Sequence, residues 1–101
     1  MIKHYSMAKY KDFAEGASKQ ENMSKGKAMT EGLKKKIPNL KHIEVGINML
    51  NGAHDYDVIS YSEYETMADV KATVSHPAHD ELLAYLKNVV EETHAVTYEV
   101  A

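Results

Sequence analysis

Residues 42–64, HIEVGINMLNGAHDYDVISYSEY, decide how the chain folds. In 43–47, apolar residues alternate with polar residues or glycine, which is the pattern of a half-buried β-strand. The dipeptide Asn51-Gly52 is typical of the tight turn in a β-hairpin, and 56–64 is a second strand-like run. The segment therefore predicts two antiparallel strands in the middle of the chain.

A helix is predicted on each side of these two strands. Ser18 and Glu21 form a capping-box pattern that opens the first helix, which runs up to Pro38. His76-Pro77 opens the second, with proline at the first helical position, and a short helical turn is expected at 67–74. The inner faces are apolar stripes: Met29, Leu33 and Ile37 in the first helix, and Leu82, Leu86, Val89 and Val90 in the second.

Two outer strands complete the pattern, at 2–10 and 93–100. The order β-α-β-β-α-β predicts an α+β, ferredoxin-like fold, in which helices cover one face of a four-stranded antiparallel sheet. Residues 1–101 form one domain. The other face of the sheet would be too apolar to leave in water, so we expect a homodimer that packs sheet on sheet. That face carries Tyr5, Met7, Ile59, Tyr61, Val96, Tyr98 and Val100.

Composition excludes several classes of protein. The chain has no cysteine, which removes disulfides, zinc–thiolate sites, iron–sulfur clusters and thiol nucleophiles. Its twelve cationic residues are all lysine and the net charge is −3, which argues against nucleic-acid binding. No apolar run approaches the length of a membrane helix, and the first residues lack the apolar core of a secretory signal. We therefore expect a cytoplasmic protein with no membrane partner.

Four stretches resemble one known family, the stress-responsive A/B barrel (Dabb) domain family. These are Ile2-Lys3-His4, Ile37-Pro38 with Val45-Gly46, His76-Pro77-Ala78-His79 and Tyr98-Glu99-Val100. The resemblance covers nearly the whole chain, and its most specific element is the His-Pro-x-His step before the last helix. It implies a dimeric α/β barrel, in which the sheets of two ferredoxin-like protomers face each other. Some members are stress-induced plant proteins, and one is a polyketide cyclase that uses no metal or organic cofactor.

The resemblance also assigns candidate catalytic residues. His79 falls on the catalytic histidine of the cyclase, and His4 falls on a pocket histidine. The position of the catalytic tyrosine holds Thr73 here, and a further pocket histidine is replaced by Val58. The implied roles are His79 as a general base and His4 as its orienting partner, with two of the four polar positions replaced.

A ligand pocket is predicted between the sheet and the helices, because small or hydroxylated side chains on the covered face fill a core poorly. The resemblance places these residues, together with His4, on the face under the helices: Ser6, Ala8, Val58, Ser60, Ser62, Ala95 and Thr97, with Thr73 at the position of the missing tyrosine. Larger side chains can instead fill the space from the helices: Met23, Met29, Tyr85 and Leu86. The sequence leaves both arrangements open.

Three function classes follow. We expect a dimeric stress-type protein of uncharacterised activity that binds a small amphipathic ligand. The alternative is a cofactor-free cyclase-like enzyme with His79 as base, and the third is a cofactor-free monooxygenase-like enzyme, which no residue specifically favours. In the non-catalytic interpretation, His76 and His79 cap the last helix through hydrogen bonds. We expect no cofactor and no metal, although His76 and His79 beside Asp80 offer two imidazoles and a carboxylate.

Overall fold

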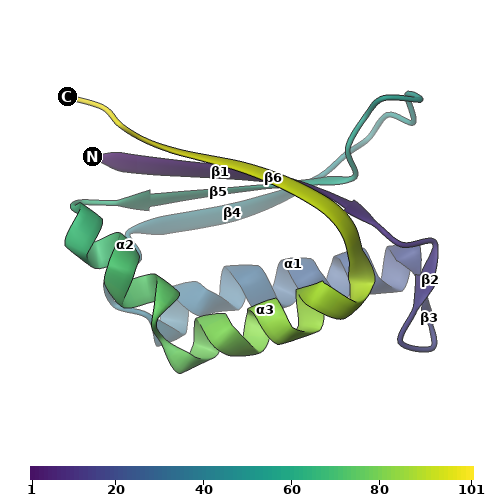
Figure 1. The fold of residues 1–101 in the computed structure, drawn as a ribbon, viewed down its shortest axis with the longest axis horizontal. Helices are drawn as coiled ribbons and strands as arrows, with labels where there is room; N and C mark the ends of the chain where they lie inside the picture. Colours follow the sequence, from purple (N-terminus) through teal and green to yellow (C-terminus); the bar gives the residue numbers. More distant parts are fainter.

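A computed structural model describes all 101 residues and confirms the predicted α+β, ferredoxin-like fold. One antiparallel sheet has the order β4-β5-β1-β6 (Figure 1). Its strands are β1 (Ile2–Tyr10), β4 (His42–Ile47), β5 (Val58–Tyr64) and β6 (Val90–Glu99). Strand β1 lies in the interior of the sheet and pairs with β5 on one side and β6 on the other, so β4 and β6 are the edges.

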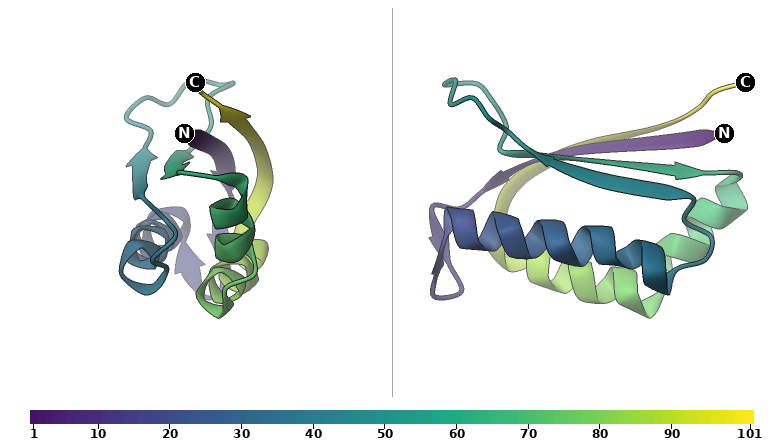
Figure 2. Two further views of the ribbon diagram at one scale, coloured as in Figure 1. Left: turned by 90° about the vertical axis from the view of Figure 1, so that its left-hand side faces the viewer. Right: turned by 180° about the vertical axis from the view of Figure 1, so that it is seen from behind.

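Two long helices cover one face of the sheet and leave the other bare (Figures 1 and 2). They are α1 (Lys19–Lys36) and α3 (Pro77–Val89), and the short α2 (Met67–Val74) links β5 to α3. The core between the layers consists of two apolar clusters. The first holds Ile2, Leu33, Ile37, Leu40, Tyr64, Ala78 and Leu82, and the second holds Tyr10, Met23, Val45, Val58 and Val89.

The connection between β4 and β5 differs from the predicted tight turn. It is a loop of residues 48–57, and its base is closed where the backbone N–H of Asn48 donates to the carbonyl of Asp57 at 2.8 Å. Gly52 does not have a positive φ, which a two-residue turn of the Asn-Gly type requires. Instead its N–H donates to the Asp55 carboxylate at 3.1 Å. Tyr56 and Asp57 therefore belong to the loop, and the strand begins at Val58.

A small hairpin before α1 was not predicted. Strands β2 (Phe13–Ala14) and β3 (Ala17–Ser18) pair across Glu15 and Gly16, whose φ angles are 52° and 70°. Two successive positive φ values are the geometry of a type I′ turn. The hairpin leads directly into α1, because Ser18 is also the N-cap residue of the predicted capping box with Glu21.

Strand β6 begins earlier than predicted, at Val90 instead of Thr93, and Val90 is therefore not part of the helical stripe. The pairing of β1 with β6 shifts register between Lys9 and Tyr10, which leaves Glu91 as an extra residue opposite them. Every residue of β6 after Val90 is exposed. The helices therefore cover β4, β5 and β1 more completely than they cover this edge.

Candidate functional site

A cavity of about 630 Å³ lies between the sheet and the helices α1 and α3, and it extends to the exposed edge strand β6. Five residues from the predicted pocket line it: Ser6, Ala8, Val58, Ser60 and Ala95. They come from three of the four strands of the sheet, β1, β5 and β6. The space is thus formed by residues that lie far apart in sequence and meet through strand pairing.

The cavity exists because a row of side chains across the sheet is short. Ser6 on β1 pairs with Ser60 on β5 and with Ala95 on β6, and Ser60 pairs in turn with Val45 on β4. On the facing layer, the space beside Gly26 of α1 is taken by the Tyr10 hydroxyl and by Leu86. The unfilled volume therefore comes from the short side chains on the sheet.

The lining is mainly apolar and carries a few hydroxyl groups. The Ser6 hydroxyl lies 3.2 Å from the Thr93 hydroxyl, whereas those of Thr30 and Ser60 have no hydrogen-bond partner in the protein. The charged lining residues are all exposed: Lys87, Glu91 and Glu92. The arrangement suits an uncharged or weakly polar molecule, because no charged group lies in its interior.

His4 and His79 lie outside the lining of this cavity. His4 is on the helix-facing side of β1, where its Nδ1 atom lies 2.7 Å from the hydroxyl of Thr97. His79 is in the first turn of α3, and its Nδ1 atom is buried without a hydrogen-bond partner. Burial lowers the pKa of both rings, and the neighbouring His79 lowers the pKa of His4 further, whereas Asp80 partly opposes the shift at His79. Both imidazoles are therefore neutral at pH 7.

Three other predicted pocket residues also lie outside the cavity. Ser62 is buried on β5, and the hydroxyl of Thr97 forms a hydrogen bond with the ring of His4. Thr73 is 1% exposed, and its hydroxyl donates to the carbonyl of Asp69 at 2.9 Å, one turn earlier in α2. At the position where the cyclase has its tyrosine, this chain therefore has a small hydroxyl that is used within a helix.

His76 is the N-cap of α3. Its Nδ1 atom accepts a hydrogen bond from the backbone N–H of Ala78 at 3.0 Å. The expected capping role is thus performed by His76 alone, because the ring of His79 makes no such bond. No three side chains of the metal-binding types converge anywhere in the structure, so His76, His79 and Asp80 do not form a shared site.

The cavity includes residues that the sequence did not single out as pocket residues. Tyr10 contributes its phenol, Gly26 and Thr30 contribute the α1 side, and Leu83 with Leu86 contributes the α3 side. The alternation along 2–10 places Tyr10 on the same face as Ser6 and Ala8, so it was available as a signal. A glycine in the middle of a helix was a second signal, because it lowers helix stability unless close packing requires it.

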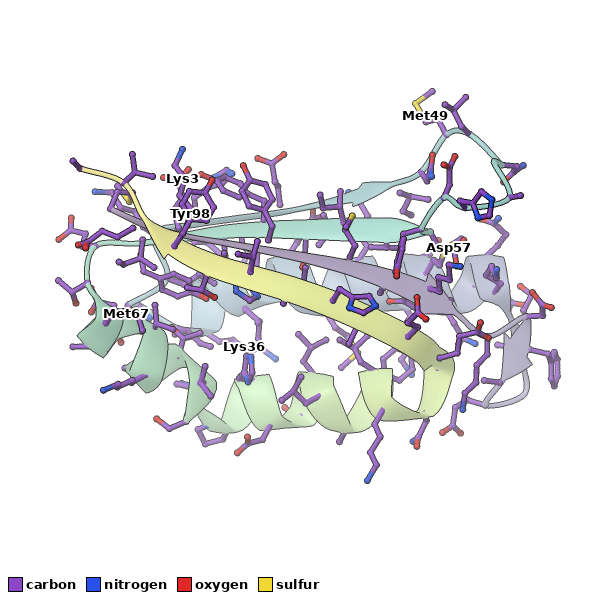
Figure 3. The ribbon with its side chains drawn as sticks, turned by 45° about the horizontal axis from the view of Figure 1, so that its top comes forward. Lys3, Lys36, Met49, Asp57, Met67 and Tyr98 are labelled. Carbon is purple, nitrogen blue, oxygen red and sulfur yellow. The ribbon has the colours of Figure 1, made fainter.

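The bare face of the sheet carries tyrosines and apolar side chains among charged ones, such as Lys3 and Glu63, which both contact Tyr61 (Figure 3). Tyr5 lies at its centre, with ring centroids 4.6 Å from Tyr61 and 6.2 Å from Tyr98. The other large apolar residues on this face are substantially exposed: Met7, Ile59 and Val96. None of the helices is both long enough and apolar enough to cross a bilayer.

A four-stranded antiparallel sheet with helices on one face and a bare opposite face defines a small α+β protein with the ferredoxin-like fold. Within that class, the chain belongs to the stress-responsive A/B barrel (Dabb) domain family, whose model matches residues 2–100. The family inferred from sequence is thereby confirmed. No match is found among curated protein sequences.

Solved structures agree with this assignment. A dimeric, ferredoxin-like protein of unknown function from Bacteroides fragilis is 31% identical, with a TM-score of 0.84 over 98% of this chain and 95% of that chain. A dimeric ferredoxin-like protein of unknown function from Thermobifida fusca is 20% identical, with a TM-score of 0.83 over 98% and 90%. A hydroxynitrile lyase from Passiflora edulis is 17% identical, with a TM-score of 0.83 over 99% and 93%. At such identities the last two show the fold alone.

Proposed function

We propose that this Dabb protein is a homodimer in which each protomer binds a small, largely apolar molecule in the cavity between the sheet and the helices. The cavity carries the proposal. An apolar, partly enclosed space that holds a few hydroxyls without protein partners has the character of a small-molecule site. Its lining by short residues on three strands leaves volume in a small domain, where close packing would otherwise stabilise the fold.

The bare face of the sheet supports the homodimer. Tyr5 contacts both Tyr61 and Tyr98, and Met7, Ile59 and Val96 are exposed on the same face, so a monomer would leave these large side chains in water. A second copy, related by a two-fold axis, would cover this face with the same face. The relatives from Bacteroides fragilis and Thermobifida fusca are both described as dimeric.

Catalysis by His79 is the second candidate. The observation in its favour is a neutral imidazole whose buried Nδ1 atom has no partner, which is the state of a ring able to accept a proton. Two features weaken it. Thr73 replaces the tyrosine with which the cyclase histidine works, and neither His79 nor His4 lines the cavity. Ligand binding without chemistry therefore accounts for more of the structure.

The test fills the cavity and measures binding of the uncharged dye Nile red by fluorescence titration. Ala8→Leu places a branched side chain in the lining, and we expect it to weaken dye binding by about 10-fold or more, roughly 1.4 kcal/mol. The matched control is Ala28→Leu on the exposed side of α1, which should bind as the wild type does. Equal binding by all three proteins would contradict the cavity site. If Ala8→Leu weakens binding as expected, mass spectrometry of the small molecules that copurify with the native protein would identify the natural ligand.

A further inference from the structure

Tyr10 ends β1 with a phenol that points into the cavity and has no hydrogen-bond partner. The side chain is 4% exposed, and it belongs to both the second core cluster and the cavity lining. The hydroxyl itself stays accessible, because Nδ1 of His79 is the one fully buried side-chain polar atom without a partner, so a molecule in the cavity can reach the phenol. Tyr85, on α3, differs in having a partner within the protein: its hydroxyl donates to the side-chain carbonyl of Asn22 at 2.9 Å.

The surrounding structure fixes the position of this phenol. A Cβ atom at Gly26 would overlap the Tyr10 hydroxyl, so the glycine provides the room that the hydroxyl occupies against α1. At its other end, the backbone N–H of Tyr10 donates to the carboxylate of Asp57 at 2.8 Å, and Asp57 also lies 3.3 Å from the ammonium of Lys19. The backbone of Tyr10 is therefore held by Asp57, and its hydroxyl is packed against Gly26.

We propose that the Tyr10 hydroxyl anchors the ligand by donating a hydrogen bond to an acceptor oxygen, and that the ligand is an uncharged, mainly apolar molecule with a carbonyl group. This inference rests on the proposed function of the cavity and names the chemical class that the cavity accepts. The hydroxyls of Thr30 and Ser60 are secondary partners, since they too have none in the protein.

The charges around the cavity select against ions. Burial raises the pKa of Tyr10 to about 12, so the phenol remains protonated and acts as a donor at physiological pH. The interior offers no cation for a carboxylate and no anion for an amine, because Lys87, Glu91 and Glu92 are exposed. A neutral carbonyl satisfies the donor without bringing an uncompensated charge into the cavity.

Two related fluorescent probes test the anchor. Prodan is an uncharged naphthalene with a dimethylamino group and a propionyl ketone, and dimethylaminonaphthalene lacks the ketone. Tyr10→Phe removes only the hydroxyl, so we expect the Kd of prodan to rise about 3- to 10-fold and that of dimethylaminonaphthalene to stay unchanged. Bound prodan should also emit at shorter wavelength in Tyr10→Phe, since its ketone loses a hydrogen bond. Tyr85→Phe is the matched control and should leave both Kd values and the emission unchanged.

The outcomes separate this inference from the proposed function. If both probes bind the wild type and lose affinity in Ala8→Leu, but Tyr10→Phe has no effect on prodan, the cavity site stands and the anchor is wrong. An equal loss for both probes in Tyr10→Phe also contradicts the anchor, because it indicates altered packing. If neither probe binds the wild type, or Ala8→Leu does not affect binding, the cavity site fails and the anchor with it.

Discussion

His79 carries a buried ring nitrogen that nothing in the protein satisfies. Such an atom lowers stability by about 1–3 kcal/mol relative to one with a partner. His4 lies near it and is also partly buried, and burial lowers the pKa of both rings from the usual 6.5. The two rings are therefore neutral in the folded protein, and they bind protons only at a lower pH than a free histidine does.

The free energy of unfolding should therefore fall in mild acid. The pKa of each ring is lower in the folded than in the unfolded protein. At a pH between the folded and the unfolded pKa, the unfolded chain therefore binds more protons than the folded one. Stability is fully present above about pH 6.5 and is lost as the pH drops toward the folded pKa values. Urea unfolding from pH 7.5 to pH 5 should show this fall, and His79→Ala should make it shallower.

The same substitution should leave stability at pH 7.5 within about 1 kcal/mol of wild type, because no hydrogen bond of the ring is lost. His54→Ala, in the exposed β4–β5 loop, is the control and should reproduce the wild-type pH profile. A profile in His79→Ala as steep as that of the wild type would show that His79 does not contribute.

Single residues mark the limit of prediction from the sequence. Alternation along β1 put Ser6 and Ala8 on one face, because the side-chain period of a strand is two, and the family resemblance placed that face beneath the helices, where the structure has both residues. The same face also holds His4, yet this ring contacts Thr97 and stays outside the cavity. Alternation gives the face of a residue but not its position relative to a void, which depends on how helices fill the space above.

At the scale of elements, the start of α3 depends on one side chain. His76 supplies the acceptor for the N–H of Ala78, and Pro77 follows at the first helical position. His76→Ala should lower stability by about 1 kcal/mol, within the usual range for a lost N-cap. For a domain of this size the melting temperature should fall by roughly 4–8 °C.

His76→Asn is the matched variant, because asparagine is a favoured N-cap and restores an acceptor. Its thermal melt should lie close to that of the wild type. If His76→Ala and His76→Asn melt at the same temperature, the cap does not contribute and another feature fixes the start of α3.

Elements with local signals were predictable, and those decided by distant contacts were not. The capping box of Ser18 and Glu21 forms as expected because both residues lie within one helical turn. Asn51-Gly52 carried the local signal of a tight turn, but the last backbone hydrogen bond between the two strands joins Asn48 and Asp57, which leaves the dipeptide within a longer loop. This loop rises on the side of the sheet away from the helices, with Met49 at its tip (Figures 1 and 3).

At the scale of the whole molecule, the bare face of the sheet determines assembly. Met7 lies on this face, and a charge buried there without a partner would cost several kcal/mol in the dimer. Met7→Asp should therefore shift sedimentation from a dimer to a species near the 11.3 kDa of one chain. Met67→Asp is the matched control, because Met67 is similarly exposed but lies on α2 at the helical side.

The wild type and Met67→Asp should both sediment as dimers at micromolar concentration. A wild type that sediments as a single chain would overturn the homodimer. A dimer that persists in Met7→Asp would place the interface elsewhere on the surface.

Strand β6 borders the cavity on one face and the bare apolar surface on the other. Thr93 and Ala95 belong to the cavity side, and His94 and Val96 alternate with them toward the bare side. In a lone protomer this exposed edge should exchange its unpaired amide hydrogens quickly. A ligand in the cavity or a second protomer on the bare face should slow the exchange. If a bound ligand stiffens β6 for the second protomer, ligand binding and dimerisation are expected to be positively cooperative, each raising the affinity of the other by the same factor.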